Sequence, residues 1–101
     1  MLLMNGYGDL RHEALTDLAC GLEEAGFLAT VNGHYAVRLS VISPAGMSGW
    51  VICDRGYGGV EWFWWIDGTP IAPASEGDVA VEEIGHELAS ANRVVVEPPQ
   101  L

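Results

Sequence analysis

Apolar residues recur every three or four positions in the first quarter of the chain, which is the period of an amphipathic helix. The apolar stripe runs from Leu10 to Ala25, and most of the charged residues fall outside it. Asp9 stands where an N-cap is expected, so a helix is predicted over residues 9–25, after a loose segment of residues 1–8.

The end of this helix carries the residue types of a Schellman motif. Gly26 is predicted at C′ in the left-handed conformation, which glycine adopts without a steric penalty. Phe27 would follow at C″ and contact Leu22, so the chain is expected to leave the helix at this glycine.

A β-hairpin is predicted next, because Asn32-Gly33 between two β-type runs is typical of a type I′ turn. Its strands are expected over residues 27–31 and 34–42. The two-residue turn would place Leu28 opposite Val37 on the apolar face of the hairpin. Phe27 would lie opposite Arg38 on the more polar face. The second strand alternates, with one face made by Tyr35, Val37, Leu39 and Val41 and the other by Ala36, Arg38, Ser40 and Ile42.

Three more strands are predicted, over residues 50–54, 60–66 and 69–72. The glycine-rich stretch between the first two is expected to be a hairpin connection, because a phosphate-binding loop needs a helix directly after it. Asp67-Gly68 is read as a second type I′ turn.

A second helix is expected to begin at Ser75 or Asp78, which are spaced like a capping box. Asn92 marks its C-cap region, and residues 94–101 are read as a strand or a tail. Its buried stripe is predicted to be Val81, Ile84, Leu88 and Ala91.

The element order predicts an α+β fold: an N-terminal helix, a four- to five-stranded antiparallel meander and a C-terminal helix, packed as a two-layer sandwich. The length of 101 residues fits one domain, expected over residues 9–93. Two helices should cover only one face of such a sheet.

The charge is one-sided, with 14 acidic residues, four arginines, no lysine and a formal net charge of −10. An acidic surface repels nucleic acids and anionic membranes, so neither is an expected partner. It would attract a basic protein, although the charge could also serve solubility alone.

The start of the chain lacks the basic and long apolar regions of a signal peptide, and Cys20 and Cys53 form no CxxC pair, so a cytoplasmic protein is expected.

The stretch from Glu61 to Ile66 is the most aromatic part of the chain. Alternation puts Trp62 and Trp64 on one face of the sheet and Phe63 and Trp65 on the other. These rings either fill the core or form a surface that binds a partner or a ligand. The residues expected to make an interaction surface are Trp50, Tyr57, Trp62, Phe63, Trp64, Trp65, Glu82, Glu83 and Glu87.

Catalytic and metal-binding motifs are weak. Glu83 and His86 form a single ExxH, whereas carboxylate-bridged dimetal sites need two such motifs and two further glutamates. No GxSxG motif occurs, and Cys20 and Cys53 are predicted to be inert core thiols. No metal, cofactor or catalytic residue is therefore assigned.

The run Trp62-Phe63-Trp64-Trp65, Gly68, Ile71-Ala72-Pro73-Ala74 and the acidic helix after it resembles small, uncharacterised acidic actinobacterial proteins. That resemblance implies no activity. The helix-sheet-helix order is also similar to double-stranded-RNA-binding domains, but Glu76, Asp78, Glu82 and Glu83 stand where that family has lysines, so RNA binding is rejected.

The sequence thus favours a non-catalytic protein-interaction module of an adaptor, chaperone-like, immunity-type or regulatory kind. Its partner would be a protein, basic in one reading, or a second copy in a homodimer. The alternative is a small-ligand-binding protein or an enzyme, with a pocket between sheet and loops lined by Trp50, Tyr57, Trp62 or Trp64.

Overall fold

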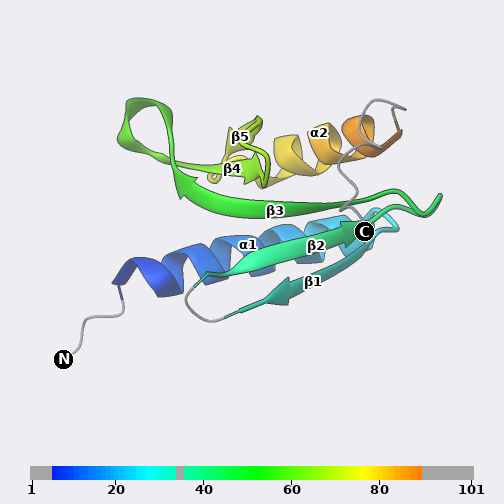
Figure 1. The fold of residues 1–101 in the computed structure, drawn as a ribbon, viewed down its shortest axis with the longest axis horizontal. Helices are drawn as coiled ribbons and strands as arrows, with labels where there is room; N and C mark the ends of the chain where they lie inside the picture. Colours follow the sequence, from blue (N-terminus) through cyan, green and yellow to red (C-terminus); the bar gives the residue numbers. More distant parts are fainter. Residues whose placement is uncertain (1–5, 34–35, 90–101) are drawn as a thin grey trace.

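An N-terminal helix, an antiparallel sheet and a C-terminal helix follow one another along the chain, which confirms the predicted α+β fold (Figure 1). The structure is a computed structural model and describes residues 6–33 and 36–89. Its elements are α1 (Gly6–Glu24), β1 (Leu28–Asn32), β2 (Arg38–Ile42), β3 (Ser48–Arg55), the short 3₁₀ turn η1 (Tyr57–Gly59), β4 (Glu61–Trp65), β5 (Pro70–Pro73) and α2 (Gly77–Ala89).

The strands form one open sheet in the order β1-β2-β3-β4-β5, so each strand pairs with its neighbour in sequence. Helix α1 packs against β1, β2 and β3, and α2 packs against β5 and α1. Both helices therefore lie on the same side of the sheet, and α1 passes behind β2 in Figure 1. Neither is long and apolar enough to span a bilayer, in the part of the chain that is described.

The core lies between the helices and the covered face of the sheet. Helix α1 contributes Leu15, Leu18 and Leu22, all almost fully buried, at the spacing predicted for its apolar stripe. Helix α2 contributes Ala80, Ile84 and Leu88, while Val81 is only partly buried. The sheet contributes Leu39, Val41, Val51, Cys53, Phe63 and Trp65.

Helix α1 begins at Gly6, so the predicted N-cap at Asp9 was wrong. The glycines at positions 6 and 8 are poor helix formers, and the apolar stripe starts only at Leu10. The first turn of α1 therefore shows no apolar periodicity from which the sequence could predict it.

The Schellman ending of α1 is confirmed. The N–H of Phe27 donates to the carbonyl of Leu22 at 2.9 Å, and the N–H of Gly26 donates to the carbonyl of Glu23 at 3.0 Å. Gly26 has a φ of 98°, the left-handed conformation that this motif requires.

The register predicted for the first hairpin was wrong. Leu28 pairs with Ile42 and Asn32 pairs with Arg38, so five positions separate the paired ends of the two strands, where two were predicted. Relative to the prediction, the partner of Leu28 moves from Val37 to Ile42, an odd number of positions. An odd shift exchanges the two faces of a strand. Leu28 is accordingly 66% exposed on the outer face, whereas Ala29 is buried.

The turn between β4 and β5 also differs from the predicted type I′ turn. The N–H of Gly68 donates to the carbonyl of Trp65 at 2.9 Å, which places Ile66 and Asp67 at the central positions. Gly68 follows with a φ of 99°, as in a three-residue hairpin loop. The Asp67 carboxylate accepts the N–H of Thr69 at 3.0 Å and stabilises this loop.

Helix α2 begins at Gly77, between the two predicted starts, and the Asp78 carboxylate accepts the N–H of Val79 at 3.1 Å. Ala91, the C-cap region at Asn92 and the strand or tail at residues 94–101 lie outside the described residues.

Candidate interaction surfaces

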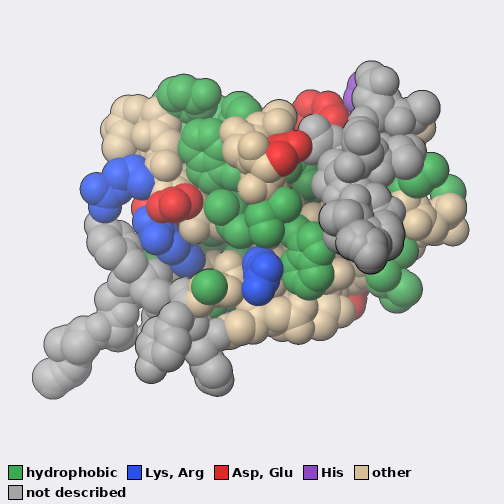
Figure 2. Space-filling model, viewed as in Figure 1, with side chains coloured by type: hydrophobic (Ala, Val, Ile, Leu, Met, Phe, Trp, Pro, Cys, Tyr) green, Lys and Arg blue, Asp and Glu red, His purple; other side chains and the backbone are tan. Residues whose placement is uncertain are grey.

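The outer face of the sheet is the side away from both helices, and its central strands carry large apolar side chains. Trp50 and Ile52 of β3 point to this face, and Trp62 and Trp64 of β4 lie beside them, with Ile52 paired to Trp64. All four are partly exposed. Figure 2 views this face and shows hydrophobic side chains gathered over the central strands.

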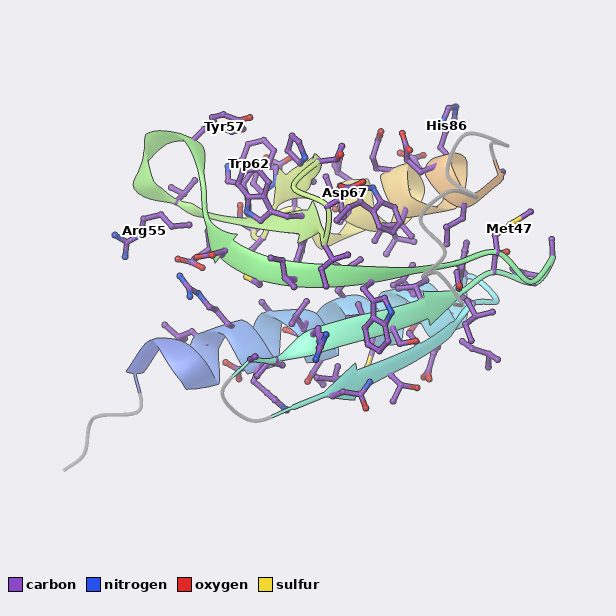
Figure 3. All side chains as sticks on the ribbon, viewed as in Figure 1. Met47, Arg55, Tyr57, Trp62, Asp67 and His86 are labelled. Atoms are coloured by element: carbon purple, nitrogen blue, oxygen red, sulfur yellow. The ribbon has the colours of Figure 1, made fainter. Side chains whose placement is uncertain are left out.

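Three of the rings contact one another and form a cluster, named here the aromatic cluster: Tyr57, Trp62 and Trp64. The Tyr57 ring meets Trp62 edge-on at 5.1 Å between ring centroids and lies 5.9 Å from Trp64. The Trp64 indole N–H donates to the carbonyl of Asp54 at 3.2 Å. Figure 3 shows Tyr57 and Trp62 together at the β3–β4 connection. These contacts thus hold the three rings in place.

Gly56 makes room for this cluster. A Cβ at position 56 would lie 2.7 Å from Cδ1 of Trp62 and 3.0 Å from Cζ2 of Trp64. The glycine-rich connection joins β3 to β4, as the sequence predicted, and Gly56 also has a packing role that the sequence did not indicate.

Trp50 lies apart from the aromatic cluster and has a cationic neighbour. The Arg38 guanidinium carbon lies 5.4 Å from the Trp50 ring centroid, within the range of a cation–π contact.

Two of the predicted interaction residues belong to the core. Phe63 and Trp65 are each 1% exposed, on the face covered by the helices. The predicted alternation is confirmed, and it removes these two rings from any surface that a partner could contact in the folded protein.

The predicted acidic residues lie on the opposite layer from the aromatic cluster. Glu82 and Glu83 are exposed on α2, and Glu87 is partly buried. Five of the 14 acidic residues lie on α1 and four on α2, so the helix layer carries most of the negative charge. The fold therefore separates an acidic helix layer from an aromatic sheet face.

An ion-pair network that the sequence did not indicate joins α1 to the sheet. Arg11 Nε donates to Glu61 Oε1 at 2.7 Å, and Arg11 Nη2 donates to Glu61 Oε2 at 3.1 Å. Arg11 Nη2 also lies 3.1 Å from Asp54 Oδ1. The hydrogen bond to Glu61 raises the pKa of Arg11. Fifty positions separate Arg11 from Glu61, so no local pattern could have found the pair.

Cys53 lies next to this network, with Sγ 3.8 Å from Glu61 Oε1. Burial, helped by the negative charge of Glu61, raises the pKa of the Cys53 thiol to about 12. The thiol therefore stays protonated at neutral pH, and a protonated thiol is a poor nucleophile. Cys20 is different: the sequence placed it in the core, but it is exposed, because it lies just past the buried Ala19 on the helix surface.

Two histidines, His12 and His86, lie in the described part of the chain. His12 and His86 are both exposed, and the His86 side chain lies on the outer surface of α2 (Figure 3). Residues 6–33 and 36–89 contain no group of three or more His, Cys, Asp or Glu side chains that could hold a metal ion.

The hollows on the surface of the described residues include one beside the helices and one beside the sheet. One, of about 550 Å³, lies between α1 and the start of α2 and is named here the helix groove. The other, of about 420 Å³, lies at the β2–β3 side of the sheet, where Arg11, Arg38 and Asp54 are among its lining residues. Neither is lined by Trp50, Tyr57, Trp62 or Trp64, the residues that the ligand-pocket alternative required.

Comparison with known proteins does not assign the chain to a family. No protein-family model matches the chain, and searches of curated proteins and of solved structures also returned no match.

Proposed function

We propose that this protein is a non-catalytic interaction module that binds a basic protein through the outer face of its sheet. One observation carries the proposal: Trp50, Trp62, Trp64 and Tyr57 are partly or largely exposed on the face that the helices leave uncovered. Clustered apolar surface of this kind is typical of binding sites, and Trp and Tyr are frequent energetic anchors there.

The aromatic cluster suits this role because its rings are already fixed. Contacts among Tyr57, Trp62 and Trp64, and the hydrogen bond from Trp64 to Asp54, restrict the side chains before binding. Less conformational entropy is then lost on association, which favours affinity.

The net charge of −10 favours a basic partner over a second copy. The net charge of the whole molecule would attract such a partner from a distance, while the aromatic residues would make the contacts. Long-range attraction of this kind raises the association rate more than the final affinity.

The test compares wild-type protein with Trp50→Ala and Trp62→Ala, and with Val79→Ala as control. Val79 is 43% exposed but lies on α2, on the other layer. We expect a partner recovered from the native host to be lost with both tryptophan variants and kept with Val79→Ala. Multi-angle light scattering should show a monomer.

Two results would count against the proposal. One is a partner that binds all three variants equally. The other is a dimer that dissociates when Trp50 or Trp62 is changed, because the sheet face would then bind a second copy.

A further inference from the structure

The helix groove has an apolar floor and an acidic rim. The apolar lining comes from α1, β4, the segment before α2, and α2 itself: Leu10, Ala14, Leu18, Phe63, Ala74 and Val81. The charged lining residues are all acidic: Glu13, Asp17, Glu24 and Asp78. Leu10 is 59% exposed, so a large apolar side chain is already available to a bound molecule.

The groove follows most of α1. Its lining residues on this helix run from Leu10 to Glu24, which corresponds to about 21 Å or four helical turns. A segment lying along it would therefore need a similar length, and an α-helix of 14 residues or more has that length with one continuous apolar stripe.

From the shape and charge of this groove, we infer that it binds a basic amphipathic helix of another protein. Apolar side chains of that helix would pack on Leu10, Ala14 and Val81. Lysines and arginines flanking its stripe would lie next to Glu13, Asp17, Glu24 and Asp78.

A second copy of this chain does not fit the groove equally well. Its own α1 and α2 carry nine acidic residues, so either helix would bring negative charge to a negative rim. Charge complementarity therefore indicates a foreign, basic segment. The groove is separate from the aromatic sheet face, and this inference holds whether or not the sheet face binds a partner.

The inference can be tested with three fluorescein-labelled peptides of 18 residues on the full chain. The first has leucines at helical spacing and lysines elsewhere. The second replaces its lysines with glutamates, and the third is a shuffled sequence of the first. We expect saturable binding of the first peptide, followed by fluorescence anisotropy, at protein concentrations below about 100 μM. The other two should bind at least about tenfold more weakly.

Charge-matched variants locate the site. Glu13→Gln with Asp17→Asn removes two rim charges, and Glu82→Gln with Glu83→Gln removes two charges from the outer surface of α2. The first pair should weaken binding about tenfold and the second less than about twofold, because only rim charges lie beside the peptide. Leu10→Ser should weaken binding about three- to tenfold through the lost apolar contact.

Three results would overturn the inference: no binding of the basic amphipathic peptide, equal binding of the shuffled peptide, or equal weakening by the two charge-matched pairs. Trp62→Ala should bind the peptide like the wild type. Loss of binding in that variant would be a fourth contrary result, because it would place the peptide on the sheet face and not in the groove.

Discussion

Arg11 Nε lies 2.7 Å from Glu61 Oε1 and joins the first helix to the fourth strand across 50 positions of sequence. Both side chains are about two-thirds buried or more, with exposed fractions of 29% and 27%. The second bond, from Nη2 to Oε2, makes the pair bidentate, which is the strongest geometry for a guanidinium and a carboxylate. The pair helps to fix α1 over the sheet.

A double-mutant cycle with Arg11→Met and Glu61→Gln measures this contact. We expect a coupling free energy of about 0.5–1 kcal/mol in the free energy of unfolding, because the pair is partly solvated. Urea titration in low salt gives the free energies of unfolding of the wild type, the two single variants and the double variant. The coupling should shrink in 1 M salt, and a coupling of zero at low salt would contradict the pairing.

The Cys53 thiol should resist alkylation in the folded protein. At pH 8, iodoacetamide is expected to label the exposed Cys20 first and Cys53 only after unfolding, because the pKa of Cys53 is raised to about 12. Mass spectrometry of the labelled peptides separates the two sites. Rapid labelling of Cys53 in the native protein would refute this expectation.

The same shift makes stability depend on pH in a predictable direction. Between the ordinary pKa of 9.0 and the folded pKa of about 12, the unfolded state loses the Cys53 proton while the folded state keeps it. The unfolded state thus binds fewer protons, and the contribution of Cys53 to stability falls as pH rises through this window. Stability curves of the wild type and Cys53→Ala should converge with rising pH, and parallel curves would argue against the shift.

Leu28 tests the hairpin register. Because Leu28 is 66% exposed opposite Ile42, Leu28→Thr should change the free energy of unfolding by no more than about 0.5 kcal/mol. Leu39→Ala, on the buried face, should cost about 2–5 kcal/mol. If Leu28 faced the core opposite Val37, the two substitutions would be similarly costly in urea denaturation.

Gly49 lies in β3 directly against the ring of Trp65. An added Cβ would lie 2.6 Å from Cζ3 of Trp65, so Gly49→Ala should destabilise the protein by about 1–3 kcal/mol through overpacking. Gly77→Ala is the control, since nothing lies within 4 Å of its Cβ position at the start of α2. It should be neutral or stabilising by up to about 1 kcal/mol. Thermal unfolding followed by near-ultraviolet circular dichroism gives the stability of each variant. Equal changes in stability for Gly49→Ala and Gly77→Ala would contradict the close contact between Gly49 and Trp65.

The elements themselves could be predicted because their signals are local. The 3.6-residue stripe of α1, the Gly26-Phe27 ending and the alternation of β4 each depend on neighbours a few positions away. For the same reason the sequence assigned Trp62 and Trp64 to one face and Phe63 and Trp65 to the other, as the structure has them.

The tertiary structure decided what depends on distant residues. A single odd shift in strand pairing turned Leu28 outward, and the preference of Asn-Gly for two-residue turns could not anticipate the pairing of Asn32 with Arg38. Likewise, Arg11, Asp54 and Glu61 came together, and α1 and α2 enclosed an acidic groove, only when the helices packed on one side of the sheet. Sequence alone determined the α+β order and the alternating aromatics, because backbone periodicity is local. Packing determined which of those surfaces remain accessible, because burial depends on every element at once.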